Sequence, residues 1–382
     1  MMIYPPRSRW HDRLVHLGVI LSLSLSVTAT TDASPIRVTT LGGESRLLVD
    51  ETNLFIYPAM AGTVPHAAVE LFDDWAGIAF PLNKRHTAGL FLGRPTAPLA
   101  RFNGYLGQSG SDLFRSLEAR PWIDLFYAAS LTPRLRAGLS ARVAVDREEA
   151  LGGEAAASEI NLRFGLGLGR ADHNQIDATF GLRRLELEDR PSAGPALEET
   201  DGDGYVVDVR ARIPKGKNLV LIPYAAVENS SYALMPDTRD EILTSFGVGI
   251  NARPAPSVLA IAGLVYEYSK ISTAEPGLPE MEETLTTGPA VIIGSEAQVG
   301  SLLFRLGVRH ESNFVEVKRG PDETTKSFDT AIAIDLGIGL EFGPLMLDGY
   351  LERDFLRDGP HLIGGSRHGG GIFSKLSLTY RL

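Results

Sequence analysis

The sequence predicts an all-β protein, a transmembrane antiparallel up-and-down β-barrel of fourteen to sixteen strands with a small N-terminal plug segment. Three observations predict this fold. Segments of about ten residues alternate between apolar and polar side chains, the stretches that join them alternate between short and long, and an export signal begins the chain. We divide the 382 residues into a signal over 1–33, a hatch-like plug segment over 34–64 and a barrel over 65–382.

The N-terminus has the pattern of a secretory signal. Arginines between positions 7 and 13 precede an apolar run over 14–29, and small residues follow it. Because the run is short for a membrane-spanning helix, we expect cleavage after Ala33, or after Ala29. An uncleaved anchor is the alternative. A cleaved signal followed by barrel strands predicts the outer membrane of a Gram-negative bacterium as the location.

The composition narrows the classes of function. The net charge of −10 argues against a nucleic-acid partner, because a phosphate backbone attracts basic surfaces. The chain has no cysteine, so neither disulfides nor thiolate chemistry are available. Its mean hydropathy of +0.00 is too low for a bundle of membrane helices. If the chain crosses a membrane, strands must do so.

The alternation is clearest over residues 328–342. In a strand, successive side chains point to opposite faces, so this segment has one apolar face and one face of small or acidic residues. Similar runs lie at 135–146, 162–169, 205–213, 242–253, 302–311, 345–354 and 372–381. The apolar face of 328–342 consists of Phe328, Ile332, Ile334, Leu336, Ile338, Leu340 and Phe342.

Two features favour a membrane barrel over a soluble sandwich. The polar faces carry glycine together with charges of both signs, as a crowded wet lumen would. The connections also alternate in length, and outer-membrane barrels have short periplasmic turns and long external loops. The expected short turns are 132–134, 171–174, 214–218, 253–257, 299–301 and 343–344, and the expected long loops are 147–157, 189–203, 229–240, 272–283, 312–326 and 356–370.

Parity sets the number of strands. From Trp122 to the C-terminus we count thirteen strands, so an odd number must precede Trp122 if both ends are periplasmic. The runs 67–72, 76–82 and 87–93 give sixteen strands in all, whereas a single strand there gives fourteen. Residues 96–121 are then expected to form a long loop, with a possible short helix at 111–119.

The C-terminal strand has the pattern that the barrel-assembly machinery recognises, although Leu382 replaces the usual terminal aromatic residue. Its outward side chains are predicted to be Leu376, Leu378, Tyr380 and Leu382. The alternative interpretation of this segment is a frayed amphipathic tail that is not part of the barrel. Barrels also carry aromatic girdles at the edges of the lipid. The candidates for these girdles are Trp75, Trp122, Tyr127, Tyr205, Tyr224 and Tyr266.

The segment between signal and barrel contains a Leu-Gly-Gly start, an acidic pair followed by an asparagine, and a Tyr-Pro-Ala element. This pattern resembles the N-terminal region of FadL-like outer-membrane transporters over about thirty residues. One departure is Tyr57, which stands where that family usually has asparagine. The matching positions are Gly42, Gly43, Asp50, Glu51, Asn53 and Pro58.

The resemblance implies a mechanism. In FadL-like proteins this segment folds inside the barrel as a hatch, and its movement opens a path for hydrophobic solutes. Such barrels have fourteen strands, so that count stays open here. The alternative is that residues 36–64 form a plain plug, or a first strand and a linker.

Many charged residues fall on the predicted lumen side of the strands. Basic residues lie mainly on the middle strands and acidic ones on the late strands, so opposite walls of opposite sign would create a field across the pore. Alternatively, these charges pair and fill a narrow lumen. The predicted lumen residues are Arg136, Arg142, Arg163, Arg183, Arg210, Arg212, Arg305, Arg309, Asp177, Asp208, Asp329, Asp335, Glu341, Asp348, Glu352 and Asp354.

Signals for catalysis are absent from the sequence. No histidine pair has metal-ligand spacing, and there is no G-x-S-x-G element. The glycines at 165, 167 and 169 alternate with leucines along a strand, which indicates a bare lumen face where the hatch could pack. We therefore predict no catalytic residue, no metal and no cofactor.

The sequence as a whole predicts a monomeric, non-enzymatic barrel that passes small solutes passively, with apolar solutes included if the FadL-like resemblance extends to function. A general porin is a close variant. Its partners would be outer-membrane lipid, the barrel-assembly machinery and a small solute. The rival hypotheses are an outer-membrane hydrolase and a non-conducting scaffold or secretion accessory.

Overall fold

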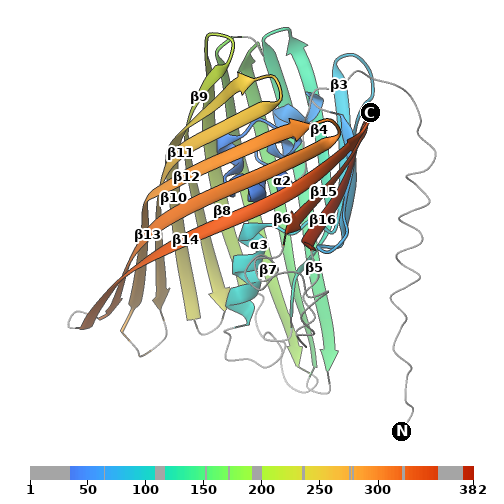
Figure 1. The fold of residues 1–382 in the computed structure, drawn as a ribbon. Coiled ribbons are helices and arrows are strands. Elements are labelled where there is room, and N and C mark those ends of the chain that lie inside the picture. Colours follow the sequence, from blue (N-terminus) through green and yellow to red (C-terminus); the bar gives the residue numbers. More distant parts are fainter. Residues whose placement is uncertain are drawn as a thin grey trace, which may run out of the picture.

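The computed structural model describes a closed antiparallel barrel of sixteen strands, in which β1 pairs with β16 (Figure 1). This confirms the larger of the two predicted strand counts. The described residues are 35–63, 65–107, 117–150, 153–170, 173–191, 200–234, 237–274, 277, 279–320, 323–351 and 373–382. The predicted signal over 1–33 lies outside them.

All sixteen strands follow one another around the wall in chain order. Within the described ranges, no helix is long and apolar enough to cross a membrane. The strands are β1 (His66–Glu70), β2 (Trp75–Pro81), β3 (His86–Leu92), β4 (Arg120–Thr132), β5 (Leu135–Ala150), β6 (Gly153–Gly169), β7 (Gln175–Pro191), β8 (Thr200–Lys215), β9 (Leu219–Leu234), β10 (Asp237–Ala255), β11 (Val258–Ala274), β12 (Met281–Val299), β13 (Leu302–Arg319), β14 (Glu323–Phe342), β15 (Leu345–Leu351) and β16 (Phe373–Arg381).

Alternation along each strand separates an apolar outer face from a polar inner face. On β7, Phe180 and Leu182 are exposed on the outside, whereas Asp177 and Arg183 are buried inside the barrel. A soluble protein would cover such an apolar outer face, but a membrane barrel turns it to lipid. The inner faces therefore define the lumen.

The prediction of long loops is wrong at three places, 147–157, 229–240 and 312–326. There, β5 pairs with β6, β9 with β10 and β13 with β14 almost to the tips of the hairpins. The backbone ladder continues past the apolar stretch because hydrogen bonding between strands does not require apolar side chains. The expected loop at 356–370 lies outside the described residues. We call the end of the barrel that carries these hairpin tips the loop end, and the opposite end the short-turn end.

The expected helix in the β3–β4 connection also lies elsewhere. The helix α3 spans Ala97–Leu106, whereas residues 117–119 have no regular structure and 111–116 lie outside the described ranges. Thr96 is the residue before the helix, and a proline lies in its first turn. Proline is well tolerated at that position because its missing N–H would have no partner there.

Two residues predicted for the aromatic girdles face inward. Trp75 and Tyr224 are 4% and 5% exposed. Trp122, Tyr127 and Tyr205 are exposed on the outside, as expected. Aromatic residues near strand ends therefore occur on both the inner and the outer face of the barrel. Their position in the sequence alone does not show which of them contact lipid.

The N-terminal segment folds inside the barrel, toward the short-turn end (Figure 1). It consists of α2 (Pro35–Thr40), η2 (Ser45–Leu47), η3 (Glu51–Phe55) and η4 (Pro58–Gly62). α2 packs against β13–β16, η2 against β9 and β10, and η4 against β2–β6. We call residues 35–63 the plug, because it contacts walls all around the bore.

The inner wall makes room for the plug by carrying glycine where the plug backbone comes close. A Cβ added to Gly307 would lie 2.6 Å from Gly42 N and 2.7 Å from Thr40 O, closer than real Cβ atoms approach other heavy atoms. The predicted packing of the hatch on a glycine face is thus seen at Gly165, next to Pro58 and Ala59. The wall glycines that approach the plug are Gly138, Gly165, Gly249, Gly263, Gly294, Gly307 and Gly337.

Candidate functional site

Buried ion pairs hold the plug to two separate parts of the wall. The first anchor consists of Arg37, Glu296, Arg305 and Asp348. Arg37 on α2 donates from Nε and Nη2 to the two carboxylate oxygens of Glu296, each at 2.9 Å. Glu296 also accepts from Arg305 Nε at 2.6 Å, and Arg305 in turn donates to Asp348 at 2.5 Å. The charges of this row alternate in sign, which offsets the cost of burying each of them.

The second anchor consists of Arg46, Tyr57, Asp208 and Arg210. Asp208 on β8 accepts from Arg46 Nε at 2.6 Å and from the Tyr57 hydroxyl. Burial raises the pKa of the Tyr57 phenol, so this hydroxyl keeps its proton and donates to the carboxylate. Both partners of Asp208 belong to the plug, so one barrel side chain fixes two separate turns of it.

Arg210 completes the second anchor. Its Nη1 donates to the Leu48 carbonyl at 2.8 Å and to Asn53 Oδ1 at 2.9 Å, and its guanidinium lies 4.5 Å from the centre of the Tyr57 ring. Its Nη2 forms an ion pair with Asp177 at 3.1 Å. Arg210 also donates to the Arg46 carbonyl at 3.3 Å, so a single guanidinium connects β7 and β8 to four plug residues.

Asp177 is surrounded by arginines on the inner wall below η4. Besides Arg210, it forms ion pairs with Arg212 at 3.2 Å and with Arg136 at 3.7 Å. Arg212 also contacts Met60 Sδ at 3.6 Å. The cluster neutralises Asp177 and leaves positive charge beneath the plug.

The predicted hatch residues shape the plug itself. Asp50 caps η3, and Asn53 takes part in the same capping box while donating to the Ser45 carbonyl at 2.9 Å. Gly42 and Gly43 have φ of 105° and 79°, a backbone conformation that glycine adopts readily. Glu51 is buried in η3, and Pro58 begins η4. The hatch pattern therefore identified residues that fold the plug, and one of them, Asn53, also contacts the wall through Arg210.

Apolar contacts add to the ionic ones on the side of β1–β4. The Phe55 ring packs edge-on against Phe91 and Phe126, with ring centres 5.0 Å and 5.8 Å apart. Trp75 and Leu54 belong to the same cluster. Edge-to-face aromatic packing of this kind fixes the orientation of the rings.

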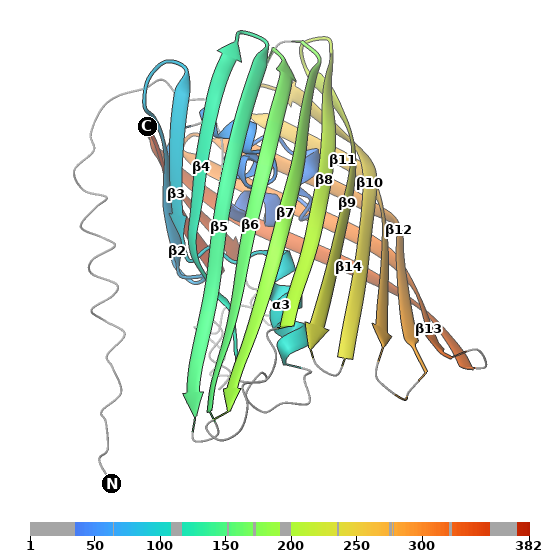
Figure 2. The same cartoon turned by 180° about the vertical axis from the view of Figure 1, so that it is seen from behind.

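A second inserted element lies nearer the loop end. The helix α3 from the β3–β4 connection is docked against the inner wall, with Phe102 stacked on Tyr232 at 5.8 Å between ring centres (Figure 2). Arg101 pairs with Glu228 at 2.5 Å and with Glu241 at 3.1 Å. The lumen is thus narrowed at two levels, by the plug and by α3.

The predicted lumen charges lie on inner faces, but most have a partner of opposite sign on the same strand or one or two strands away. Arg142 pairs with Glu159, Arg183 with Glu228, Arg309 with Glu311 and Glu341 with Arg381. Asp335 accepts from the Tyr350 hydroxyl at 2.6 Å. These pairs favour the alternative of structural pairing over a field between two walls. Asp329 is exposed on β14, and Glu352 and Asp354 lie outside the described residues.

Sequence reasoning missed several partners that the structure brings to this site. The strand acids Asp124, Glu159, Glu228 and Glu296 fall on inner faces, so the alternation could have found them. Arg37 and Arg46 lie inside the predicted hatch, and a basic residue in a segment expected to be buried calls for an acidic partner. Nothing in the sequence indicates which acid each arginine meets.

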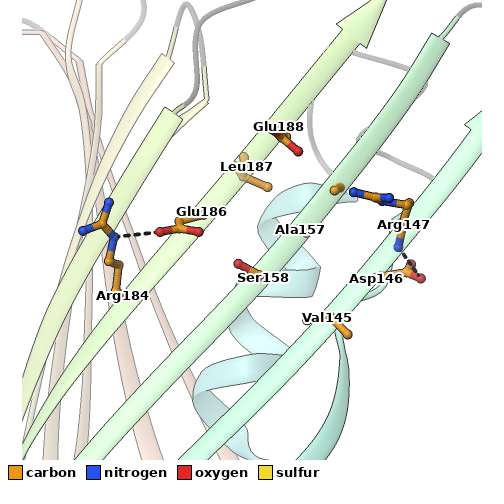
Figure 3. A pocket seen from close by; sticks show the side chains of 10 residues that line it. Val145, Asp146, Arg147, Ala157, Ser158, Arg184, Glu186, Leu187 and Glu188 are labelled. Atoms are coloured by element: carbon orange, nitrogen blue, oxygen red, sulfur yellow. Dashed lines mark hydrogen bonds and ion pairs between the residues drawn. The ribbon is translucent and has the colours of Figure 1, made fainter.

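A hollow of about 480 Å³ on β5–β7 lies near their loop ends (Figure 3). Around it the outer side chains change from apolar Val145 to Arg147 and from Leu182 to the ion pair of Arg184 with Glu186. The hollow therefore marks the outer edge of the apolar band. Among the residues that the structure describes, no group of three or more His, Asp or Glu is placed to hold a metal ion.

Comparison with known proteins gives similarity of fold alone. No family model and no curated protein matches the sequence. The CymD monoaromatic hydrocarbon channel is 9% identical, with 92% of this chain and 98% of that chain covered and a TM-score of 0.42. The toluene transporter TodX from Pseudomonas putida is 10% identical, with the same coverage of 92% and 98% and a TM-score of 0.38.

Another similar structure is the siderophore receptor PirA from Acinetobacter baumannii, which is 8% identical with a TM-score of 0.38. The match covers 75% of this chain and 61% of the receptor, so the chain spans about three fifths of the receptor's length. These matches, all at or below 10% identity, concern the arrangement of strands alone.

Proposed function

We propose that this chain is an outer-membrane channel whose N-terminal plug must be displaced for small solutes, apolar ones included, to pass passively. This proposal depends above all on one observation: residues 35–63 lie inside the barrel, contact the wall on many strands and are fixed to two separate parts of it by buried ion pairs. Residues 1–33 would be removed on export, and the alternating C-terminal strand fits recognition by the barrel-assembly machinery.

The nature of the anchors supports a movable plug. Each anchor is made of charge-assisted hydrogen bonds, and water or a passing solute can replace these partners. The wall strands pair with one another around the whole circumference, so the barrel does not need the plug to close. Displacing the plug therefore breaks the two anchors and three apolar clusters but no strand pairing.

The surface that the plug presents supports apolar solutes. Within the stretch from Asp50 to Ala61, Phe55 and Ile56 are the two residues that are not buried. Val49, also in the plug, is exposed, so apolar side chains of the plug are open to a solute. Burial of apolar surface against them gains about 25 cal/mol per Å², which suits weak binding in transit.

Single-channel conductance in a planar bilayer tests the proposal, comparing the mature protein with a variant that lacks residues 35–63. We expect the intact protein to be closed or nearly so, and the deletion variant to conduct steadily. Heat-modifiable migration on a gel would verify that both barrels are folded. Equal conductance of the two proteins would contradict a gating plug, and silence of both would contradict transport.

A further inference from the structure

The short-turn end of the barrel is basic, although the whole chain has a net charge of −10. The turns and adjoining strand ends there contain seven lysines and arginines but one acidic residue, Asp172. All seven basic side chains are exposed, and none forms an ion pair within the described parts of the chain. The segments counted are 82–85, 132–134, 170–174, 214–218, 253–257, 299–301 and 343–344, and the basic residues are Lys84, Arg85, Arg134, Arg170, Lys215, Lys217 and Arg253.

A hollow of about 380 Å³ lies at this end, where β8, β9, β10 and β11 run side by side (Figure 2). Ala252 is two residues from Ile250, whose side chain is exposed on the outside, so Ala252 belongs to the outer face. The small side chains of Ala252 and its partner Ala260 leave the wall bare at this point. One row of paired residues thus crosses all four strands, and it consists of Lys215, Leu219, Ala252 and Ala260.

Basic side chains border the hollow toward the short-turn end. Lys217 and Arg253 line it together with Lys215. The backbone N–H of Arg253 donates to the Asn218 carbonyl at 2.7 Å, which holds this part of β10 against the β8–β9 turn. Among the described residues that line the hollow, none is acidic. Three cations therefore surround it without a carboxylate to balance them.

The apolar band borders the hollow on its other side. The next row of paired outer residues is apolar throughout, so the outer face changes from apolar to small to basic within a few residues. Phospholipid headgroups lie directly outside the hydrocarbon layer, and the hollow has the same position relative to the apolar band. The residues of the apolar row are Ile213, Leu221, Ile250, Ala262 and Ile293.

The hollow at the loop end of the band differs in charge. Arg147 and Arg184 border that hollow, but so do Glu186 and Glu188 (Figure 3). Arg184 forms an ion pair with Glu186 at 2.9 Å. Carboxylates thus balance the arginines at the loop end, whereas the hollow at the short-turn end lacks negative charge.

We propose that the hollow between the β8–β9 turn and the end of β10 binds the phosphate group of an anionic phospholipid from the adjoining leaflet. The phosphate supplies the negative charge that Lys215, Lys217 and Arg253 lack, and basic pockets at a membrane surface hold anionic headgroups in this way. An acyl chain continues over Leu219 onto the apolar row. A choline headgroup would bring a further cation to the three already present, so the site favours phosphatidylglycerol. The proposal goes beyond transport, because it needs a lipid-facing wall but no movement of the plug.

Native mass spectrometry of the full mature protein tests this assignment. The protein is released from micelles that contain equal amounts of phosphatidylglycerol and phosphatidylcholine with the same acyl chains. We expect one phosphatidylglycerol molecule to stay bound in preference to phosphatidylcholine. Lys217→Gln and Arg253→Gln should each weaken this binding about fivefold, because each removes one basic residue from beside the phosphate. Ala260→Leu keeps every charge but fills the hollow, and it should also reduce the bound lipid.

Arg184→Gln is the matched control, because it removes a basic residue from the hollow at the loop end. It should leave phosphatidylglycerol binding unchanged, and heat-modifiable migration on a gel would verify that every variant is folded. Equal retention of the two lipids, or equal losses in Arg184→Gln and Arg253→Gln, would overturn the proposal. Unchanged binding in Ala260→Leu would mean that a diffuse basic surface attracts the lipid and would overturn the hollow as its site. Displacement of the lipid by millimolar inorganic phosphate would make the hollow a site for a soluble anion instead.

Discussion

At the scale of single residues, the site depends on buried charges that meet across long distances in sequence. Arg37 and Glu296 are 259 residues apart, and Arg46 and Asp208 are 162 residues apart. Each buried charge without its partner would cost several kcal/mol. Among the carboxylates, Asp208 holds two plug residues at once, Arg46 and Tyr57.

Asp208→Asn should loosen the plug without unfolding the barrel. Asparagine keeps the shape but loses the charge that holds Arg46 and the Tyr57 hydroxyl, which should cost about 2 kcal/mol in plug docking. Hydrogen exchange of plug amides between Arg46 and Tyr57 should then speed up roughly 30-fold. Asp329→Asn on the exposed part of β14 is the control, and equal exchange in both variants would argue against the anchor.

Gly307→Ala should displace α2 from its wall. The added methyl would meet Gly42 N and Thr40 O, which are backbone atoms that cannot move aside alone. We expect conductance to appear in the intact chain without any deletion. Gly104→Ala is the matched control, since nothing lies within 4 Å of its added Cβ. A closed Gly307→Ala channel would mean that α2 shifts while the bore stays filled.

At the scale of elements, strands and inserted segments differ in how much the sequence reveals. The three short strands β1, β2 and β3 lie within one or two residues of their predicted ranges, because period-two alternation marks each strand locally. The hairpin tips were mistaken for loops, since polar residues on both faces still pair. The position of α3 and the pairing of the anchors could not be predicted in this way. They depend on contacts between segments that are far apart in the sequence, and such contacts produce no periodic pattern.

Phe102→Ala should release α3 from the inner wall. Phe102 is fully buried and stacks on Tyr232, and truncating a buried phenyl group costs about 3–5 kcal/mol. A helix of 10 residues has little stability of its own, so its amides should lose protection from hydrogen exchange. Phe304→Ala removes an exposed phenyl group from the outer face and should leave α3 unchanged. Retained protection in Phe102→Ala would contradict docking through this cluster.

At the scale of the whole molecule, the apolar side chains on the outside form a band whose extent along each strand fits a flat layer of constant thickness, here called the slab. On β7 the outer face is free of charge from Ile176 to Leu182, which is about 20 Å of strand, and Arg184 follows. On β14 the apolar face runs from Phe328 to Phe342, about 46 Å of strand. β14 runs far more obliquely than β7 (Figure 2), and an inclined strand stays longer within a layer of fixed thickness. A lipid bilayer is such a layer, whereas a protein partner would not impose one thickness on strands of different inclination.

The slab makes the cost of a charge depend on depth. Phe180→Arg places a guanidinium near the middle of the band and should lower the free energy of unfolding by about 2–4 kcal/mol. Ser158→Arg, two residues beyond the apolar Ile160 and beside the charged hollow of Figure 3, should cost about 1 kcal/mol or less. Guanidinium unfolding in lipid vesicles measures both. Equal costs at the two positions would mean that the outer face is covered by something other than lipid, because only a layer with an apolar middle and polar edges distinguishes them.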